Sequence, residues 1–478
     1  MEPIIEALAP QLETWIEESR PDLLRDLMDL ARIPSVSGPA QGPYPYGEAC
    51  AAALRKGEEI ARRRGFSTRN HDNHCVTALF PGRTERTIGI FCHLDVVAAG
   101  NGWQSDPYAP FVKDGHVFGR GVTDNKGPAA AMLSLLQFLR QQHVALDHSI
   151  LLYLGGSEET GMQDLDWYLA HEAPPELSLT PDAHFSVCNG EKGHITANLT
   201  APLPGGIVSF TGGAASNAVP DTASLILRAG DAARLRERLG DGYTVEAADA
   251  GIRISASGRS AHAAFPETGE NAIVKLCCGL LESGDLDSET AAFLKGYLAL
   301  FQDCHGSGLR IACADEPSGQ LTAVGGRLRT ADGIAEQSLD IRYPVTADPG
   351  WVQENLTAAA AEAGYAVSDF ENSPPVYFPA EHPMIKLLND TCNEVLGTDL
   401  KPYVIGGGTY ARMLPAAVAC GHLLRSRFRP GGPGKGGGHQ ADECVSIQGL
   451  EDLMRVYLRA LIRLDRLPDK TSPKENQT

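Results

Sequence analysis

A strand–helix–strand pattern in the first third of the chain constrains the fold most. Two short apolar runs, TIGIFCHLDVV (87–97) and HSILLYLGG (148–156), have the length and composition of buried strands. Between them, GPAAAMLSLLQFLRQQ (127–142) carries apolar residues at helical spacing, and Pro128 suits the first turn of a helix. Strand, helix and strand in this order predict a largely parallel sheet with covering helices.

The chain changes character near residue 195 and again near residue 368. Between these points it reads as strand-like segments separated by polar helices, and helical segments such as MIKLLNDTCNEVLG follow. A length of 478 residues fits two or three domains. We therefore expect an α/β fold: a discontinuous domain with a mixed, mostly parallel sheet covered by helices, interrupted by an inserted α+β domain. The expected boundaries are 1–195 and 369–470 for the first domain, 196–368 for the insertion and 471–478 for a disordered tail.

Composition limits the cellular compartment and the binding partners that we expect for this protein. Hydrophobic residues make up 43% of the chain, enough for a sizeable core, and the formal net charge of −19 argues against nucleic acid or an anionic membrane as partner. Neither a transmembrane helix nor a signal peptide is expected. The 11 cysteines form no C-x-x-C, which favours a reducing cytoplasm. The glycine-rich PGGPGKGGG (430–438) is expected to be a mobile loop and not a P-loop, because glycine follows Lys435.

Histidine and acidic residues follow the ends of the expected strands. In an extended FCHLDVV, His93 and Asp95 project to the same side, where an imidazole can bind metal while the carboxylate fixes its tautomer. The alternative is a hydrogen-bonded pair without metal. Glu158 and Glu159 follow the second strand, so one can coordinate metal while the other moves protons. The alternative for these two is a solvated acidic loop.

Three further residues extend this set. Asp124 precedes the expected helix, so it either caps that helix or, if His93 is close, serves as a ligand. Asp182 lies in PDAHF with His184 as a competing ligand, and His439 lies in HQADE, where a lone histidine is more often structural. Two histidines, two aspartates and a glutamate pair in one domain match the nitrogen and oxygen donors of a two-metal catalytic site.

The order and variety of the motifs carry a resemblance to a known family. The motifs are IPSVSG, HLDVV, GWQSDPY, GRGVTDNKGP, GGSEETG, PDAHF, NGEKG, GRSAHAAFP, DIRYPV, GGGTYAR and HQADE, and they span residues 33–443. This set resembles the M20 family of metallopeptidases, and within it the dipeptidase branch typified by the PepV and Sapep enzymes. The resemblance implies that the inserted domain is the lid domain of that family.

The resemblance also implies five metal ligands shared by two ions. They are His93 and Asp182 on one ion, Glu159 and His439 on the other, and Asp124 as the bridge between the two. Glu158 is implied as the general base, and Asp95 as the residue that orients His93. The peptide bond between Asp124 and Asn125 is implied to be cis, as is frequent in the family.

Substrate contacts are implied mainly in the lid. His262, in GRSAHAAFP, would stabilise the tetrahedral oxyanion, whereas without the resemblance it reads as a plain surface residue. Asn217 and Arg342 match positions that hold the substrate backbone or carboxylate, a task that suits the planar guanidinium fork. The alternative for Arg342 is a salt bridge to Asp340 or another acid. Two further candidates for contact with the substrate terminus lie in GGGTYAR: Thr409 and Arg412.

These features together predict a cytoplasmic, dinuclear metal-dependent dipeptidase. Two divalent ions would activate a water for attack on the peptide bond of a dipeptide. Zn²⁺ is the expected ion, with Mn²⁺ or Co²⁺ as alternatives at a carboxylate-rich site. The alternative activity is hydrolysis of N-acyl or N-carbamoyl amino acids, and a non-catalytic binding homologue or a scaffold is a further alternative. The expected state is a monomer or a homodimer without nucleic-acid or membrane partners.

Overall fold

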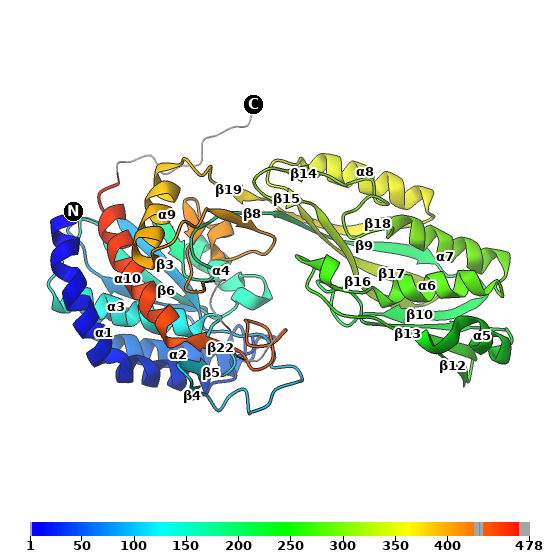
Figure 1. The fold of residues 1–478 in the computed structure, drawn as a ribbon, viewed down its shortest axis with the longest axis horizontal. Helices are drawn as coiled ribbons and strands as arrows, with labels where there is room; N and C mark the ends of the chain where they lie inside the picture. Colours follow the sequence, from blue (N-terminus) through cyan, green and yellow to red (C-terminus); the bar gives the residue numbers. More distant parts are fainter. Residues whose placement is uncertain (1, 425–429, 431–433, 468–478) are drawn as a thin grey trace. The chain divides into compact units, whose positions relative to one another are not determined.

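The computed structural model describes residues 2–424, 430 and 434–467. Residues 431–433 of the expected mobile loop and the expected tail, 471–478, lie outside this range. The chain forms two compact units, whose elements are labelled in Figure 1. The first unit comprises Met1–Asn189, Phe378–Tyr403 and Gly408–Thr478, and the second comprises Gly190–Tyr377 and Val404–Gly407.

A mixed sheet forms the centre of the first unit. Its strand order is β1-β2-β6-β3-β7-β21-β8-β19, and β20 also pairs with β8. The strands β6, β3, β7 and β21 run parallel, whereas β1, β2 and β8 are antiparallel to their neighbours. The bounds are β1 Ser67–His71, β2 Cys75–Phe80, β3 Thr87–His93, β6 Ser149–Gly155, β7 Leu177–Thr180, β8 Cys188–Glu191, β19 Val376–Tyr377, β20 Tyr403–Ile405 and β21 Ala417–Ala419. The chain passes between the units within β8, directly after β19, within β20, and between Gly407 and Gly408.

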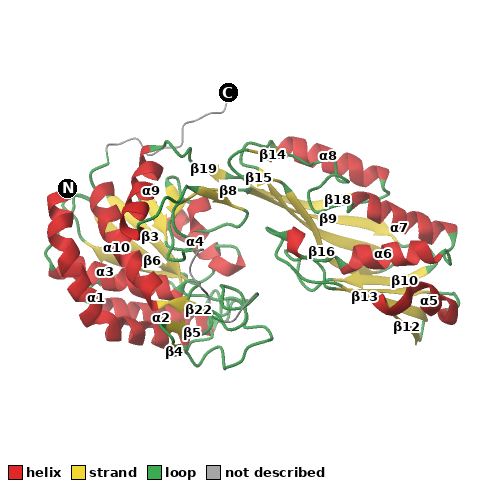
Figure 2. Ribbon diagram, in the orientation of Figure 1, coloured by secondary structure: helices red, strands yellow, loops and turns green. Residues whose placement is uncertain are grey.

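Helices cover this sheet, as Figure 2 shows. The predicted strand–helix–strand unit is confirmed, because β3, α3 and β6 follow one another and β3 pairs in parallel with β6. Helix α3 packs against α1 and α10, and α2 packs on β1, β2 and β6. The bounds are α1 Glu2–Ala31, α2 Glu48–Arg63, α3 Lys126–Gln141, α4 Gln163–His171, α9 Pro383–Leu396 and α10 Ile447–Leu464, with short 3-10 helices η1 Glu158–Thr160 and η4 Tyr410–Met413. None of the described helices is both long and apolar enough to cross a membrane.

Two local features explain how the helices lie. Helix α1 is one continuous helix that runs through Pro10 and Pro21. In α2, a Cβ on Gly57 would lie 2.7 Å from Cδ1 of Leu94 and 3.0 Å from Cδ1 of Leu154. Because glycine lacks this atom, α2 approaches closely the residues that follow His93 in the chain.

A small antiparallel sheet joins two distant parts of the first unit. It consists of β4 Phe111–Lys113, β5 His116–Phe118 and β22 Cys444–Ser446, in the order β22-β5-β4. Cys444 pairs with Phe118. This pairing brings the segment after His439 beside the segment that leads to Asp124.

The second unit is an antiparallel sheet with helices along one side (Figure 2). The strand order is β12-β13-β11-β10-β16-β17-β9-β18. Its core includes Phe210, Leu276, Tyr297 and Leu339. The strands are β9 Gly193–Pro202, β10 Ile207–Gly212, β11 Thr222–Leu227, β12 Tyr243–Ala248, β13 Gly251–Ser257, β16 Thr322–Ala331, β17 Ile334–Tyr343 and β18 Ala366–Ser373. The helices are α5 Ala232–Leu239, α6 Ala272–Ser283, α7 Ser288–Leu300 and α8 Pro349–Glu362, with η2 Gly240–Gly242, η3 Pro266–Thr268 and the short pair β14 Ala314–Asp315 and β15 Gly319–Gln320.

Six of these eight strands overlap the segments that the sequence marks as strand-like, HITANLTA, VSFTGG, ASLILRA, GIRISASG, LTAVGGRLR and SLDIRYPV. The two that the sequence did not indicate, β12 and β18, are the edge strands of the sheet. Most of their side chains are exposed or only partly buried, so neither carries the apolar pattern of a strand that is covered by neighbours.

Candidate metal centre

Three neighbouring parallel strands deliver the first group of predicted residues. His93 is the last residue of β3, Glu158 and Glu159 open η1 shortly after β6, and Asp182 follows β7. The strands lie in the order β6, β3, β7 and run in the same direction. Their carboxyl ends therefore meet at one edge of the sheet, where α/β folds place their ligands.

Asp124 lies between two histidines from distant parts of the chain. Its Oδ1 is 2.9 Å from Nε2 of His93, and its Oδ2 is 3.1 Å from Nε2 of His439. Nε2 of His93 is also 3.5 Å from Oδ2 of Asp182, and Nε2 of His439 is 3.0 Å from Oε2 of Glu159. The contacts thus form two sets that share the Asp124 carboxylate.

The structure does not show the alternative of a helix cap at Asp124. The N-cap of α3 is Asn125, whose side chain makes no capping hydrogen bond, and the Asp124–Asn125 peptide bond is cis. Among the described residues, two groups of three side chains have ligand atoms within 4.8 Å of one another, and neither includes His184 or His439. The groups are His93, Asp124, Glu159 and His93, Glu158, Asp182.

Burial and hydrogen bonding shift the pKa values of Glu158, Glu159 and His439. It raises the pKa of Glu158 well above its usual value, and it raises the pKa of Glu159 to about 7. Burial alone would lower the pKa of His439, but hydrogen bonds to Asp124 and Glu159 raise it to about 11. Glu158 and Glu159 are thus hard to ionise without a cation. Asp124 differs, because burial alone would raise the pKa of its carboxyl group but hydrogen bonds to His439 and His93 lower it.

The donor set fits divalent metal ions. In the described part of the chain, no lysine or arginine forms an ion pair with Asp124, Glu158, Glu159 or Asp182. Four buried or partly buried carboxylates without a lysine or arginine partner are energetically costly to hold together. Imidazole nitrogens and carboxylate oxygens are the donors of catalytic zinc sites, and the arrangement around Asp124 suits a carboxylate that bridges two ions.

Asp95 connects the histidine of β3 to the two glutamates. Its carboxylate accepts hydrogen bonds from the backbone N–H groups of Glu158 at 3.1 Å and Glu159 at 3.0 Å. Its Oδ1 is 3.4 Å from Nδ1 of His93, which also lies 3.0 Å from the Asp95 carbonyl oxygen. The expected partner of His93 therefore also holds the backbone that presents both glutamates.

Asp164 is a second buried carboxylate beneath this turn, and the sequence reasoning missed it. It accepts hydrogen bonds from the N–H groups of Gly156 at 2.8 Å and Ser157 at 3.3 Å, and from the Tyr410 hydroxyl at 2.5 Å. Burial and the nearby charge of Asp95 raise the pKa of Asp164 to about 6. The available signal was an acidic residue in the first turn of the helix that follows SEETG.

In the second unit, His262 and Asn217 lie on adjoining segments. Both side chains are exposed. Ala218 and His262 form an antiparallel backbone bridge, and the N–H group of Ala263 donates to the Asn217 carbonyl at 2.9 Å. The fold therefore places these two predicted substrate contacts side by side.

Arg342 lies close to the same loop and has two kinds of partner. Its Nη1 donates to the Gly406 carbonyl at 2.5 Å, and a Cβ on Gly406 would lie 3.1 Å from Cβ of Ala264, two residues after His262. Its Nε also donates to Oδ1 of Asp340 at 2.9 Å, and both side chains are buried. The salt bridge that was the alternative for Arg342 is therefore present, beside the predicted substrate contacts.

Thr409 and Arg412 lie in the first unit, around η4. The Thr409 hydroxyl accepts a hydrogen bond from the N–H group of Ala411 at 3.1 Å, so it caps this short helix. The N–H group of Arg412 donates to the Thr409 carbonyl at 3.1 Å. η4 also carries Tyr410, which reaches Asp164 beneath the glutamate turn.

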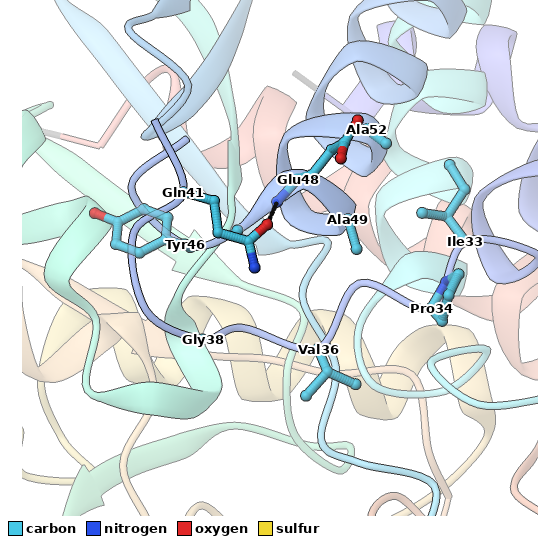
Figure 3. Close-up of a pocket in the computed structure, with 10 residues that line it drawn as sticks. Ile33, Pro34, Val36, Gly38, Gln41, Tyr46, Glu48, Ala49 and Ala52 are labelled. Carbon is cyan, nitrogen blue, oxygen red and sulfur yellow. Dashed lines mark hydrogen bonds between the residues drawn. The ribbon is translucent and has the colours of Figure 1, made fainter. Parts of the chain in front are cut away.

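A separate hollow of about 500 Å³ opens over the start of α2 (Figure 3). Figure 3 shows Gln41 directed at the N–H group of Glu48, with a hydrogen bond of 3.2 Å. Of the ten described residues that line the hollow, Glu48 is the only acid and none is a histidine, so it is not a second metal centre. Its loop is tied to the glutamate turn, because the Thr160 hydroxyl donates to Ser37 at 2.8 Å.

Histidine and carboxylate donors gathered at the carboxyl ends of parallel strands fit the class of metal-dependent hydrolases. The sequence model of peptidase family M20/M25/M40 matches residues 89–463. "Putative dipeptidase YtjP" of Bacillus subtilis (strain 168) is 32% identical over 476 residues, which cover 95% of this chain and 99% of the relative. "Putative dipeptidase SSP1012" of Staphylococcus saprophyticus is 29% identical over 475 residues, which cover 94% of this chain and 98% of the relative.

The chain therefore belongs to peptidase family M20/M25/M40, which confirms the resemblance and the expectation of a peptide-hydrolysing enzyme. Solved structures agree at the level of the fold. Human carnosine dipeptidase 1 has a TM-score of 0.60 at 15% identity, with 96% of this chain and 99% of that one covered. The dipeptidase Dug1p of Saccharomyces cerevisiae has a TM-score of 0.59 at 13% identity, with 96% and 98% covered. The expected fold class is thereby confirmed.

Proposed function

We propose that the protein is a dinuclear metal-dependent dipeptidase. The observation that carries this proposal is the Asp124 carboxylate between His93 and His439, at 2.9 and 3.1 Å, with Asp182 and Glu159 in contact with the same histidines. The descriptions of the two bacterial relatives support dipeptides as the substrate class.

Two divalent ions would be held by these five side chains. When bound, the ions supply positive charge that acidifies a water molecule and polarises the scissile carbonyl. We propose Zn²⁺ as the preferred ion, with Mn²⁺ or Co²⁺ as substitutes. A cytoplasmic location and a monomeric or homodimeric state complete the proposal.

Glu158 is the proposed general base and acid. It is only 9% exposed, and its carboxylate groups with His93 and Asp182. It takes a proton from the attacking water and then gives that proton to the nitrogen of the leaving amine. Burial raises the pKa of Glu158, which brings the carboxylate closer to the range in which it can exchange protons at neutral pH. Asp95 keeps Glu158 in place through the backbone N–H group and orients His93.

The second unit is the proposed lid domain. His262 is proposed to stabilise the oxyanion by donating a hydrogen bond, and Asn217 and Arg342 to bind the substrate backbone or carboxylate. Thr409 and Arg412 are proposed to contact the substrate terminus. The family resemblance carries these assignments, and the common location of the first three within one unit supports them.

The deciding experiment follows hydrolysis by HPLC in metal-stripped protein. A panel of dipeptides, N-acyl and N-carbamoyl amino acids is incubated with Zn²⁺ or Mn²⁺ added back separately. Metal-dependent cleavage of dipeptides supports the proposal. Cleavage of only the N-acyl or N-carbamoyl compounds would replace it by an amidohydrolase, and no turnover of any compound by protein that holds two metal ions would indicate a binding homologue.

A further inference from the structure

We propose that Glu443 is a positioning residue for the metal centre. It fastens the chain segment that carries His439 to the loop, residues 119–124, that carries Asp124. The expected effect of Glu443 on metal binding rests on the proposed function. The contacts between Glu443 and loop 119–124 are contacts within the polypeptide and do not depend on that function.

The Glu443 carboxylate is enclosed by the amide groups of this one loop. The residue has 0% exposure. Its Oε1 accepts hydrogen bonds from the N–H groups of Thr123 at 3.0 Å and Asp124 at 3.3 Å, and its Oε2 accepts one from Gly121 at 3.1 Å. Its backbone carbonyl accepts another from Gly119 at 3.0 Å. Glu443 alone thus accepts hydrogen bonds from four backbone N–H groups of loop 119–124.

Arg120, in the same loop, supplies the countercharge. Its Nη1 is 2.6 Å from Oε2 of Glu443, and the two side chains are 1% and 0% exposed. Its Nη2 donates to the Ala99 carbonyl at 3.1 Å, and its guanidinium lies 5.1 Å from the centre of the Trp103 ring. Because the guanidinium is held on three sides, loop 119–124 receives Glu443 in a single orientation.

The strands next to Glu443 and to loop 119–124 also pair with each other. β22 begins directly after Glu443 and pairs with β5, which ends directly before loop 119–124, and Figure 1 shows the two labels side by side. His439 lies four residues before Glu443 in the chain, and its Nε2 is 3.1 Å from Oδ2 of Asp124. Glu443 therefore fixes the backbones behind two proposed ligands that must meet at the shared carboxylate.

Substitution by glutamine would weaken this junction without creating a cavity. One carboxylate oxygen becomes an NH₂ group, which cannot accept a hydrogen bond from the N–H groups or the guanidinium that face it. Partners that hold metal ligands in place typically contribute about 10–100-fold to metal affinity. We therefore expect Glu443→Gln to loosen loop 119–124 and to lower the affinity for Zn²⁺ by about 10–100-fold.

Glu451→Gln is the matched control. Glu451 is also a buried glutamate of the C-terminal segment, and it is paired with Arg20 at 2.7 Å, on the side of α10 that meets α1. Its loss removes an ion pair of similar length, with a partly exposed arginine, away from the proposed ligands. Both variants are expected to have a lower melting temperature than the wild type.

The test compares full-length wild type, Glu443→Gln and Glu451→Gln after metal removal. Competition with a chromophoric chelator gives the Zn²⁺ affinity, and hydrogen exchange of the metal-free protein gives the protection of residues 119–125. Only Glu443→Gln is expected to exchange faster in this segment and to bind Zn²⁺ more weakly, with kcat recovering in excess metal.

Zn²⁺ affinity and exchange within twofold of the wild type in Glu443→Gln would overturn the inference, whatever its melting temperature. If that variant does not fold, Glu443→Asp, which withdraws the oxygens by one methylene, is judged by the same two measurements. A wild type that binds neither Zn²⁺ nor Mn²⁺ would instead sink the proposed function. Even if the wild type binds no metal, a hydrogen-exchange rate of residues 119–125 that is the same in Glu443→Gln and wild type would refute the role of Glu443 in holding the loop.

Discussion

Replacing Glu158 by alanine should separate proton transfer from metal binding. Asp95 holds the backbone N–H groups of Glu158 and Glu159 at 3.1 and 3.0 Å, so the turn survives the loss of the Glu158 side chain. A general acid–base group contributes about 10²–10⁴-fold to rate. At about 1.36 kcal/mol per tenfold, this equals about 2.7–5.4 kcal/mol of transition-state stabilisation. We expect kcat for a dipeptide to fall by that factor while both metal ions remain bound.

The assay combines HPLC of dipeptide cleavage with elemental analysis of the purified protein. Glu159→Ala is the paired variant, and it should lose metal because Glu159 is in contact with His439 at 3.0 Å. If Glu158→Ala keeps more than a tenth of the wild-type kcat, Glu158 is not the general base. If it loses metal instead, Glu158 is a ligand, consistent with its grouping with His93 and Asp182.

Further predictions concern the supports of the site. Asp164→Asn leaves an NH₂ group against N–H donors and the Tyr410 hydroxyl, and should cost about 1–3 kcal/mol of unfolding free energy in urea titrations. Because burial raises the pKa of Asp164 from 3.8 to about 6, the folded wild type binds more protons than the unfolded chain between these values. Its stability should therefore fall, and its advantage over Asp164→Asn should shrink, as the pH rises from about 4 to about 6; a constant or growing advantage would contradict this. Gly57→Ala should destabilise the protein by about 1–3 kcal/mol through contact with Leu94 and Leu154, and an unchanged melting temperature would show that α2 can shift. Chelation should lower the melting temperature, and Zn²⁺ at 100 times its dissociation constant should restore about 2.7 kcal/mol; no shift on chelation would argue against a resident ion.

His93, Glu159 and Asp182 could be proposed as ligands from the sequence because they stand at or just after strand ends. His93, Glu159 and Asp182 follow strands whose apolar runs are visible locally, and parallel strands bring their carboxyl ends together. The residues that hold these ligands in place were not accessible in the same way. Asp164 and Glu443 accept hydrogen bonds from backbone amides, and a backbone amide leaves no mark in the sequence of its partner.

The sequence by itself determined the α/β class, the strand–helix–strand unit, the donor types of the site and the family. These follow from apolar spacing and from the order of short motifs, both of which are local properties of the chain. Only the tertiary structure decided that Asp124 lies between His93 and His439, and that Asp95 serves both a histidine and two glutamates. It also decided that Arg342 already has an acidic partner in Asp340. The physical reason is that such contacts join segments far apart in the chain, and their distances are set by the packing of helices and strands against one another.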